Sequence, residues 1–202
     1  MMKVSDFKYT ATTPKTITEP IRQFCRELST EEPVVLDVRR DAFADQGRCY
    51  INASEVAQRL GGKVVFGWLV WELAGVYVTA EHHAVAEIDG TMIDVTPPFA
   101  GEQKVVFVPD AITEYRSQII PNRYASLVAS ELITRYVEIA ARNSALFAAG
   151  KGFGHEYNAN DREMTGLLDL YFSRLRNGGE KQASRKKRKL ERMRKKQGRR
   201  NK

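Results

Sequence analysis

The sequence has little cysteine and little histidine. It contains two cysteines, Cys25 and Cys49, and three histidines among 202 residues. Two cysteines are too few for a disulfide-stapled scaffold. They are also too few for a zinc site built from cysteine alone, because structural zinc usually takes four Cys or His ligands. We therefore expect no structural metal and no cofactor.

Long apolar runs and an N-terminal leader are also missing. The most apolar stretch, residues 64–78, is interrupted by Glu72 and is too short to span a bilayer. The chain opens on the polar segment MMKVSDFKYT, which is unlike a signal peptide. These absences predict a soluble cytoplasmic protein without a membrane association, with a nuclear location as the alternative in a eukaryotic host. The sequence is silent on its oligomeric state.

Charge divides the chain into two unequal parts. The net charge is +7, but residues 181–202 hold 13 Lys and Arg and a single acid, Glu191, which amounts to +12. Residues 1–180 hold 19 basic and 24 acidic residues, which amounts to −5. We therefore predict a folded domain over residues 1–178 and a basic tail over residues 179–202, separated at the Gly178-Gly179 pair.

The tail has too few apolar residues to pack a core, so we expect a disordered or marginally helical arm. Such arms bind polyanions by releasing counterions, which predicts nonspecific, salt-sensitive binding to nucleic acid. The alternative is a solubilising tail with no dedicated partner. The residues that would contact nucleic acid are Arg185, Lys186, Lys187, Arg188, Lys189, Arg192, Arg194, Lys195 and Lys196.

Hydrophobic periodicity indicates helices at both ends of the domain and strands in the middle, which is an α+β pattern. The predicted helices span residues 19–28, 49–60, 125–149 and 161–175. The predicted strands span residues 34–38, 63–72, 76–88, 91–96 and 105–108.

Cys49 begins a predicted helix, directly after the flexible segment Gln46-Gly47-Arg48. A helix N-terminus and a neighbouring imidazole both favour a thiolate, which is the reactive form of cysteine. The later strands supply His82, His83 and Asp94. Cysteine, histidine and aspartate can act as a nucleophile, its base and the group that orients the base. A buried inert thiol is the plainer reading of Cys49.

The turn Asp89-Gly90 decides which histidine lies beside Asp94. A two-residue hairpin loop at this point pairs Ile88 with Thr91. His83 and Asp94 then share a face as diagonal neighbours, roughly 7–8 Å apart between Cα atoms. A three-residue loop would bring His82 there instead. We predict His83 as the base.

These residues resemble a known superfamily. The segments GRCYINA (47–53), HAVAEI (83–88), GTMIDVTP (90–97) and GKVVFGW (62–68) are similar to the boxes around the nucleophile, base and acid of transglutaminase-like proteins, within the papain-like group. The resemblance covers residues 45–98. It implies a nucleophile helix packed on an antiparallel sheet, and acyl transfer or amide hydrolysis through a thioester on Cys49, with His83 as base and Asp94 as its orienting group.

Three further residues are candidates for binding substrate or the oxyanion. Gln46 lies upstream of the nucleophile, as the glutamine of the papain group does, although it is closer to the cysteine. His82 is a candidate, and so is Trp68, since one of Trp68 and Trp71 could wall the cleft; packing in the sheet is the plainer interpretation of all three. The sequence thus supports a cysteine hydrolase or acyltransferase acting on a peptide or amide. The alternative is a noncatalytic interaction module that the tail anchors to nucleic acid.

Overall fold

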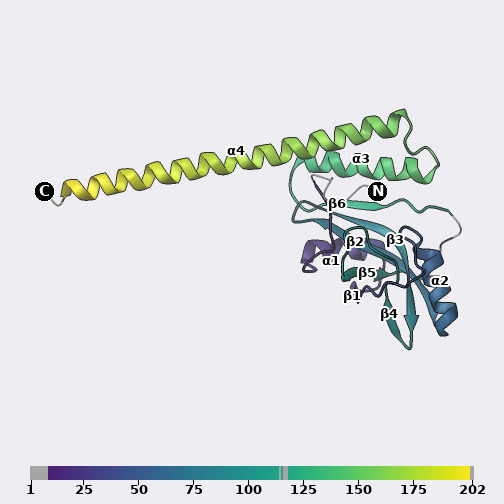
Figure 1. Cartoon of the computed structure of the whole chain (residues 1–202). Coiled ribbons are helices and arrows are strands. Elements are labelled where there is room, and N and C mark those ends of the chain that lie inside the picture. Colours follow the sequence, from purple (N-terminus) through teal and green to yellow (C-terminus); the bar gives the residue numbers. More distant parts are fainter. Residues whose placement is uncertain (1–8, 114, 116–117, 201–202) are drawn as a thin grey trace.

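The computed structural model describes residues 9–113, 115 and 118–200, with side chains up to residue 178. It is an α+β fold built on an antiparallel sheet, with two C-terminal helices (Figure 1). The helices are α1 (Glu19–Leu28), α2 (Cys49–Leu60), α3 (Glu131–Ala148) and α4 (His155–Arg200). The strands are β1 (Val34–Asp37), β2 (Lys63–Leu73), β3 (Tyr77–Ile88), β4 (Thr91–Ile93), β5 (Lys104–Pro109) and β6 (Arg123–Ser126).

The sheet curls toward closure. Its order is β1-β5-β2-β3-β4, with β6 paired to the first part of β3. Directly after the two outer strands, Val38 and Asp94 form an isolated bridge that joins β1 to β4. The chain thus brings the two edges of the sheet together into a small barrel, a closure that leaves few strand edges exposed.

The alternation of side chains along the strands separates an interior from an exterior. Leu36, Leu69, Val85, Val105 and Phe107 are buried together and fill the interior. The opposite face of the sheet is covered by two helices, as the period of two along a strand requires. There α1 packs through Ile21, Phe24 and Cys25 on a cluster that includes Trp68 and Val78, whereas α2 packs through Val56 against Ala86, Ile93 and Val95.

Gly67 is a close-packed position inside the barrel. It lies directly opposite His83 in the β2–β3 ladder. A Cβ atom added at Gly67 would lie 2.2 Å from the carbonyl oxygen of Val108 and 2.5 Å from Cζ of Phe107. Because glycine has no side chain, the ring of Phe107 can occupy this space, next to the strand position of His83.

The helices α3 and α4 cover the other end of β3. Ile133, Tyr136 and Ala140 of α3 pack with Leu168 of α4 on Tyr77. The predicted helix over residues 125–149 begins later, at Glu131, because residues 123–126 pair with β3 as β6. Tertiary pairing overrides the local helical pattern there.

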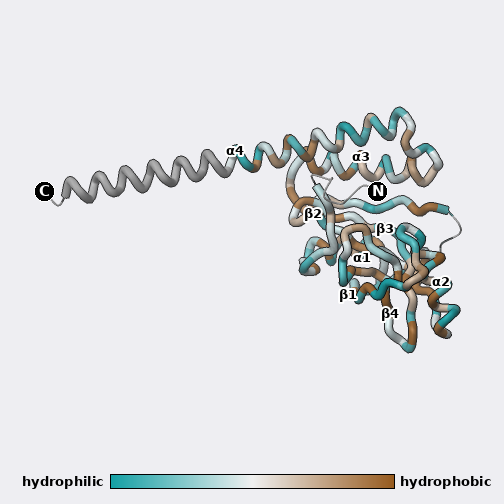
Figure 2. The backbone as a smooth tube through the Cα atoms, viewed as in Figure 1, coloured by the Kyte–Doolittle hydropathy of each residue, from teal (hydrophilic) through white to brown (hydrophobic). Residues whose placement is uncertain are grey.

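The last helix is much longer than the predicted span of residues 161–175. α4 begins at His155 and continues through Gly178-Gly179 to Arg200, and its C-terminal half extends away from the other elements (Figure 1). Lys, Arg, Leu, Met, Glu and Gln are good helix formers, and the segment lacks proline. Where Figure 2 colours α4, hydrophilic and hydrophobic residues alternate along the helix, as they do in an amphipathic helix.

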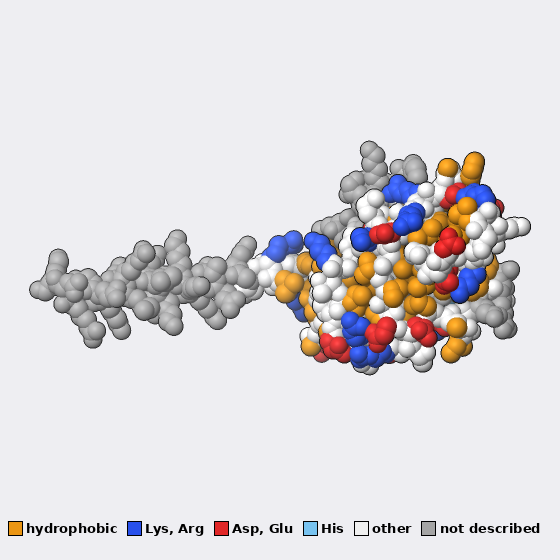
Figure 3. Space-filling model, turned by 90° about the horizontal axis from the view of Figure 1, so that it is seen from below, with side chains coloured by type: hydrophobic (Ala, Val, Ile, Leu, Met, Phe, Trp, Pro, Cys, Tyr) orange, Lys and Arg blue, Asp and Glu red, His pale blue; other side chains and the backbone are white. Residues whose placement is uncertain are grey.

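Charges of both signs are interspersed on the face of the globule that Figure 3 shows. Among the described residues, no helix is long and apolar enough to cross a membrane.

Candidate active site

The candidate site lies at a gap in the sheet edge. One edge of β3 pairs with β6 through residues 77–80 and with β4 through residues 86–88. The N-terminal end of α2 reaches the segment between them, where the Tyr50 hydroxyl donates a 3.1 Å hydrogen bond to the carbonyl oxygen of His82. This contact replaces a strand partner and holds the start of α2, and therefore Cys49, against β3.

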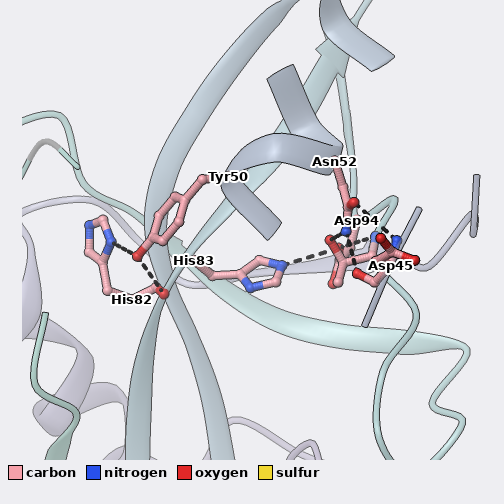
Figure 4. Close-up of polar contacts among 7 residues, drawn as sticks. Asp45, Tyr50, Asn52, His82, His83 and Asp94 are labelled. Carbon is pink, nitrogen blue, oxygen red and sulfur yellow. Dashed lines mark hydrogen bonds and ion pairs between the residues drawn. The ribbon is translucent and has the colours of Figure 1, made fainter. Parts of the chain in front are cut away.

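The hairpin after β3 has the predicted register. Ile88 pairs with Thr91, and Asp89 and Gly90 both have positive φ angles of 50° and 75°, as a type I′ turn requires. His83, and not His82, consequently faces Asp94, with 3.1 Å between His83 Nε2 and Asp94 Oδ1. Figure 4 shows the two histidine rings pointing to opposite sides of β3. The geometric prediction for this pair is confirmed.

Asp94 is fixed by its backbone as well as by its side chain. Its N–H donates to the carbonyl oxygen of Asp37 at 3.1 Å, and its carbonyl oxygen accepts from Arg39 N–H at 2.8 Å. Its Oδ1 accepts a further bond, 3.0 Å long, from the backbone N–H of Thr96. The barrel closure therefore holds the carboxylate, which is only 1% exposed, in one position under His83.

The surroundings of His83 favour its protonated form. Burial by itself lowers the pKa of the ring, because it removes water from the charged state. Hydrogen bonding and negative charge from Asp94 and from Cys49 outweigh the burial and raise the pKa of His83 from 6.5 to about 10. The imidazole thus interacts with the acid and with the thiol at once, as the middle member of a triad does.

Cys49 itself is the first residue of α2 and is 8% exposed. Its backbone N–H has no acceptor within its own helix, since the first four N–H groups of a helix have none. This N–H points out of the N-terminal end of α2, which is the positive end of the helix dipole. The N–H is therefore a candidate donor to an oxyanion formed near the sulfur.

Asn52 joins the elements of the site and was missed by sequence reasoning. Its amide accepts from Asp45 N–H at 3.1 Å and donates to the Asp45 carbonyl oxygen at 2.7 Å. The same amide donates to Thr96 Oγ1 at 3.1 Å, and Thr96 in turn contacts Asp94. Asn52 is 3% exposed, and it ties the loop before Cys49 to the segment after Asp94 (Figure 4). A polar residue on the apolar face of the predicted helix was the only signal for it.

Both ring nitrogens of His82 have hydrogen-bond partners other than Cys49 and Asp94. Its Nδ1 lies 2.9 Å from the Tyr50 hydroxyl, and its Nε2 lies 3.0 Å from the carbonyl oxygen of Thr113. Burial lowers its pKa, which favours a neutral ring. Its Nε2 then donates to Thr113, and the single proton of the Tyr50 hydroxyl is shared between His82 Nδ1 and the carbonyl oxygen of His82. The structure thus gives His82 a packing role that positions Tyr50.

Trp68 is also away from the predicted triad. It lies opposite His82 in the sheet, is 3% exposed and donates from Nε1 to Asp110 Oδ2 at 3.0 Å. The tryptophan that lines the cavity at Cys49 is Trp71. The difference follows from strand alternation, because positions 68 and 71 lie on opposite faces of β2.

Gln46 lies in the half-buried loop before Cys49, and its predicted role at the oxyanion stays a prediction. The basic side chains predicted to bind nucleic acid lie outside the described side chains, and only the helical backbone of α4 is given there.

Two cavities meet at Cys49. A small one of about 50 Å³ is lined by Cys49, His83, Asp94 and Trp71 among others. A larger one of about 510 Å³ reaches from Cys49 and Tyr50 to α3 and α4. The thiol therefore opens onto space large enough for an extended ligand. Among the described residues, no three His, Cys, Asp or Glu side chains gather as a metal ion would need.

Comparison with protein-family models finds no match, and neither do comparisons with curated proteins and with solved structures.

Proposed function

We propose that the chain is a cysteine-dependent amide or peptide hydrolase or acyltransferase of the transglutaminase-like type. The observation that carries the proposal is the His83 ring, which is hydrogen-bonded to Asp94 at 3.1 Å while the Cys49 thiol interacts with the same ring. The curled sheet and the nucleophile helix at its edge agree with the arrangement that the sequence resemblance implies.

Because its surroundings favour the protonated form of His83, the reaction starts with the Cys49 proton already on His83, as a thiolate beside an imidazolium. The sulfur attacks the carbonyl carbon of an amide, and the C=O π electrons move to the oxygen, which the backbone N–H of Cys49 is placed to receive. His83 then returns its proton to the nitrogen as the C–N bond breaks, so that an amine leaves and a thioester remains.

The second step consumes the thioester. Water, or an amine in the acyltransferase case, loses a proton to His83 and attacks the thioester carbonyl, and the sulfur leaves as the Cys49 thiolate. Asp94 is a positioning residue throughout, because it contacts His83 and stabilises the imidazolium.

An activity-based thiol probe, iodoacetamide carrying an alkyne tag, tests the proposal. We expect labelling of Cys49 at neutral pH in the native protein, loss of labelling in Cys49→Ala, and unchanged labelling in the matched control Cys25→Ala. Equal or absent labelling of both cysteines in the folded protein contradicts an activated thiolate, and favours the noncatalytic module.

A further inference from the structure

A third cavity lies beside the active-site cavity. It has a volume of about 220 Å³, and its walls include Trp71, Thr79, Glu81, Phe99 and Glu102. Three of these residues, Trp71, Glu81 and Phe99, also line the small cavity that contains Cys49 and His83. The side cavity therefore adjoins the cavity at Cys49 and shares three of its lining residues.

Two buried polar atoms in this cavity have no hydrogen-bond partner among the residues that the structure describes. They are Thr79 Oγ1, on a residue only 8% exposed, and Glu102 Oε2, and both residues line the cavity. Tyr124, which pairs with Thr79 across β3 and β6, brings its hydroxyl close to that of Thr79, and the Thr79 oxygen has two lone pairs, so it can still accept from a ligand. A buried acceptor without a partner is costly, so both atoms are prepared to accept from a ligand that enters the cavity.

The chemistry of the walls selects a cation. Glu81 and Glu102 contribute two carboxylates, and neither takes part in the salt bridges of the described residues. Trp71 and Phe99 add aromatic rings, which attract cations through their faces. A ligand that donates hydrogen bonds and carries positive charge satisfies the carboxylates, the hydroxyl and the rings together.

We propose that this side cavity is a specificity subsite that binds a cationic group, an ammonium or a guanidinium, of the substrate's acyl donor. The inference rests on the proposed chemistry at Cys49. Its volume of about 220 Å³ suits one side chain or chain terminus rather than a whole ligand. The acyl donor would thus place its carbonyl at Cys49 and its positive group between Glu81 and Glu102.

Three iodoacetamides that differ only in their amide substituent test this subsite. The substituents are butyl, 4-aminobutyl and 4-guanidinobutyl, and the measurement is the rate of Cys49 alkylation in the full-length protein. We expect both cationic probes to react about tenfold faster than the butyl probe, the range of a charge-assisted hydrogen bond. The two cationic probes compared with each other distinguish an ammonium from a guanidinium substrate.

Substitutions then locate the effect. Glu102→Gln and Thr79→Val should each reduce the ratio of cationic to butyl rates toward one, whereas Glu55→Gln, which removes an equal charge from the outer part of α2, should keep it. Salt should reduce the ratio in the wild-type protein, where no substitution can disturb folding.

The outcomes separate the two proposals. Selective butyl labelling of Cys49 with a ratio of one overturns the subsite alone. A ratio above one that survives both Glu102→Gln and Thr79→Val also overturns it, because the selectivity then comes from elsewhere. Failure of all probes to select Cys49 overturns the proposed function.

Discussion

Replacing Asp94 by asparagine tests the central contact of the site. The side chain of asparagine has nearly the same shape, and its carbonyl oxygen can still accept from Thr96 N–H and from His83 Nε2. The substitution therefore removes the charge while it preserves the 3.1 Å geometry. Its effect reports electrostatics rather than packing.

The magnitude follows from the hydrogen bond. A bond to a charged group contributes about 1–2 kcal/mol more than a neutral bond, which corresponds to roughly one pKa unit. The pKa of His83, about 10 in the native protein, should therefore fall by at least about one unit. Because the folded pKa lies above the ordinary value of 6.5, the stabilisation is full below pH 6.5 and is lost as the pH rises through 10. Asp94→Asn should destabilise the protein more at pH 6 than at pH 11.

The assay is the rate of Cys49 alkylation by iodoacetamide between pH 5 and 10, followed by mass spectrometry of the Cys49 peptide. In the wild-type protein the rate should stay high as long as His83 is protonated, because the charge of the imidazolium stabilises negative charge on the sulfur. In Asp94→Asn the His83 ring should lose its proton about one pH unit lower, so the alkylation rates of the two proteins should differ most between pH 9 and 10, where their imidazolium contents differ most. Asp37→Asn, which neutralises an exposed carboxylate at the end of β1, is the matched control and should resemble the wild type.

An identical pH profile in Asp94→Asn and the wild-type protein, with the fold intact by circular dichroism, would refute the reasoning. It would show that Asp94 does not control the charge of His83.

Two other substitutions and one labelling experiment probe the surroundings. Asn52→Leu should lower the free energy of unfolding by about 1–3 kcal/mol, because partners at Asp45 and Thr96 are left without their hydrogen bonds; urea denaturation measures it, and an unchanged midpoint would contradict the network. Gly67→Ala should destabilise the fold by about 2 kcal/mol or more, since its Cβ collides with backbone and with a ring, and a thermal melt equal to that of Gly166→Ala, at an open position, would contradict this. Native Cys25 should resist iodoacetamide at pH 8, because burial raises its pKa to about 11; rapid native labelling would place it outside the core.

Much of the local structure follows from the sequence. The bounds of α1 and α2, and the Ile88–Thr91 hairpin register, are as predicted. Each depends on short-range signals: Pro20 at the start of α1, Gly61 in a left-handed conformation after α2, and Asp89-Gly90 in the turn. Those signals act within a few residues, so they can be recognised without the fold.

The features that the sequence did not predict depend on contacts between distant segments. The strand β6 and the later start of α3 depend on pairing with β3, more than 40 residues away in the sequence. The roles of Asn52 and Trp71 depend on which way a helix or strand faces once the barrel closes. The hydrogen bonds of the His82 ring depend on Tyr50 and on the carbonyl oxygen of Thr113, which no local sequence pattern brings together.

The sequence by itself determined the α+β class, the divided charge, and a turn that puts His83 and Asp94 on one face. Only the tertiary structure decided that the Cys49 thiol meets that face, because α2 fills a gap between β6 and β4 that exists only in the assembled sheet. It alone also placed Thr79 Oγ1 and Glu102 Oε2, which have no hydrogen-bond partner in the described structure, in a cavity that adjoins the one at Cys49. Periodicity fixes the face on which a side chain lies, whereas contacts between distant segments depend on how the whole chain packs.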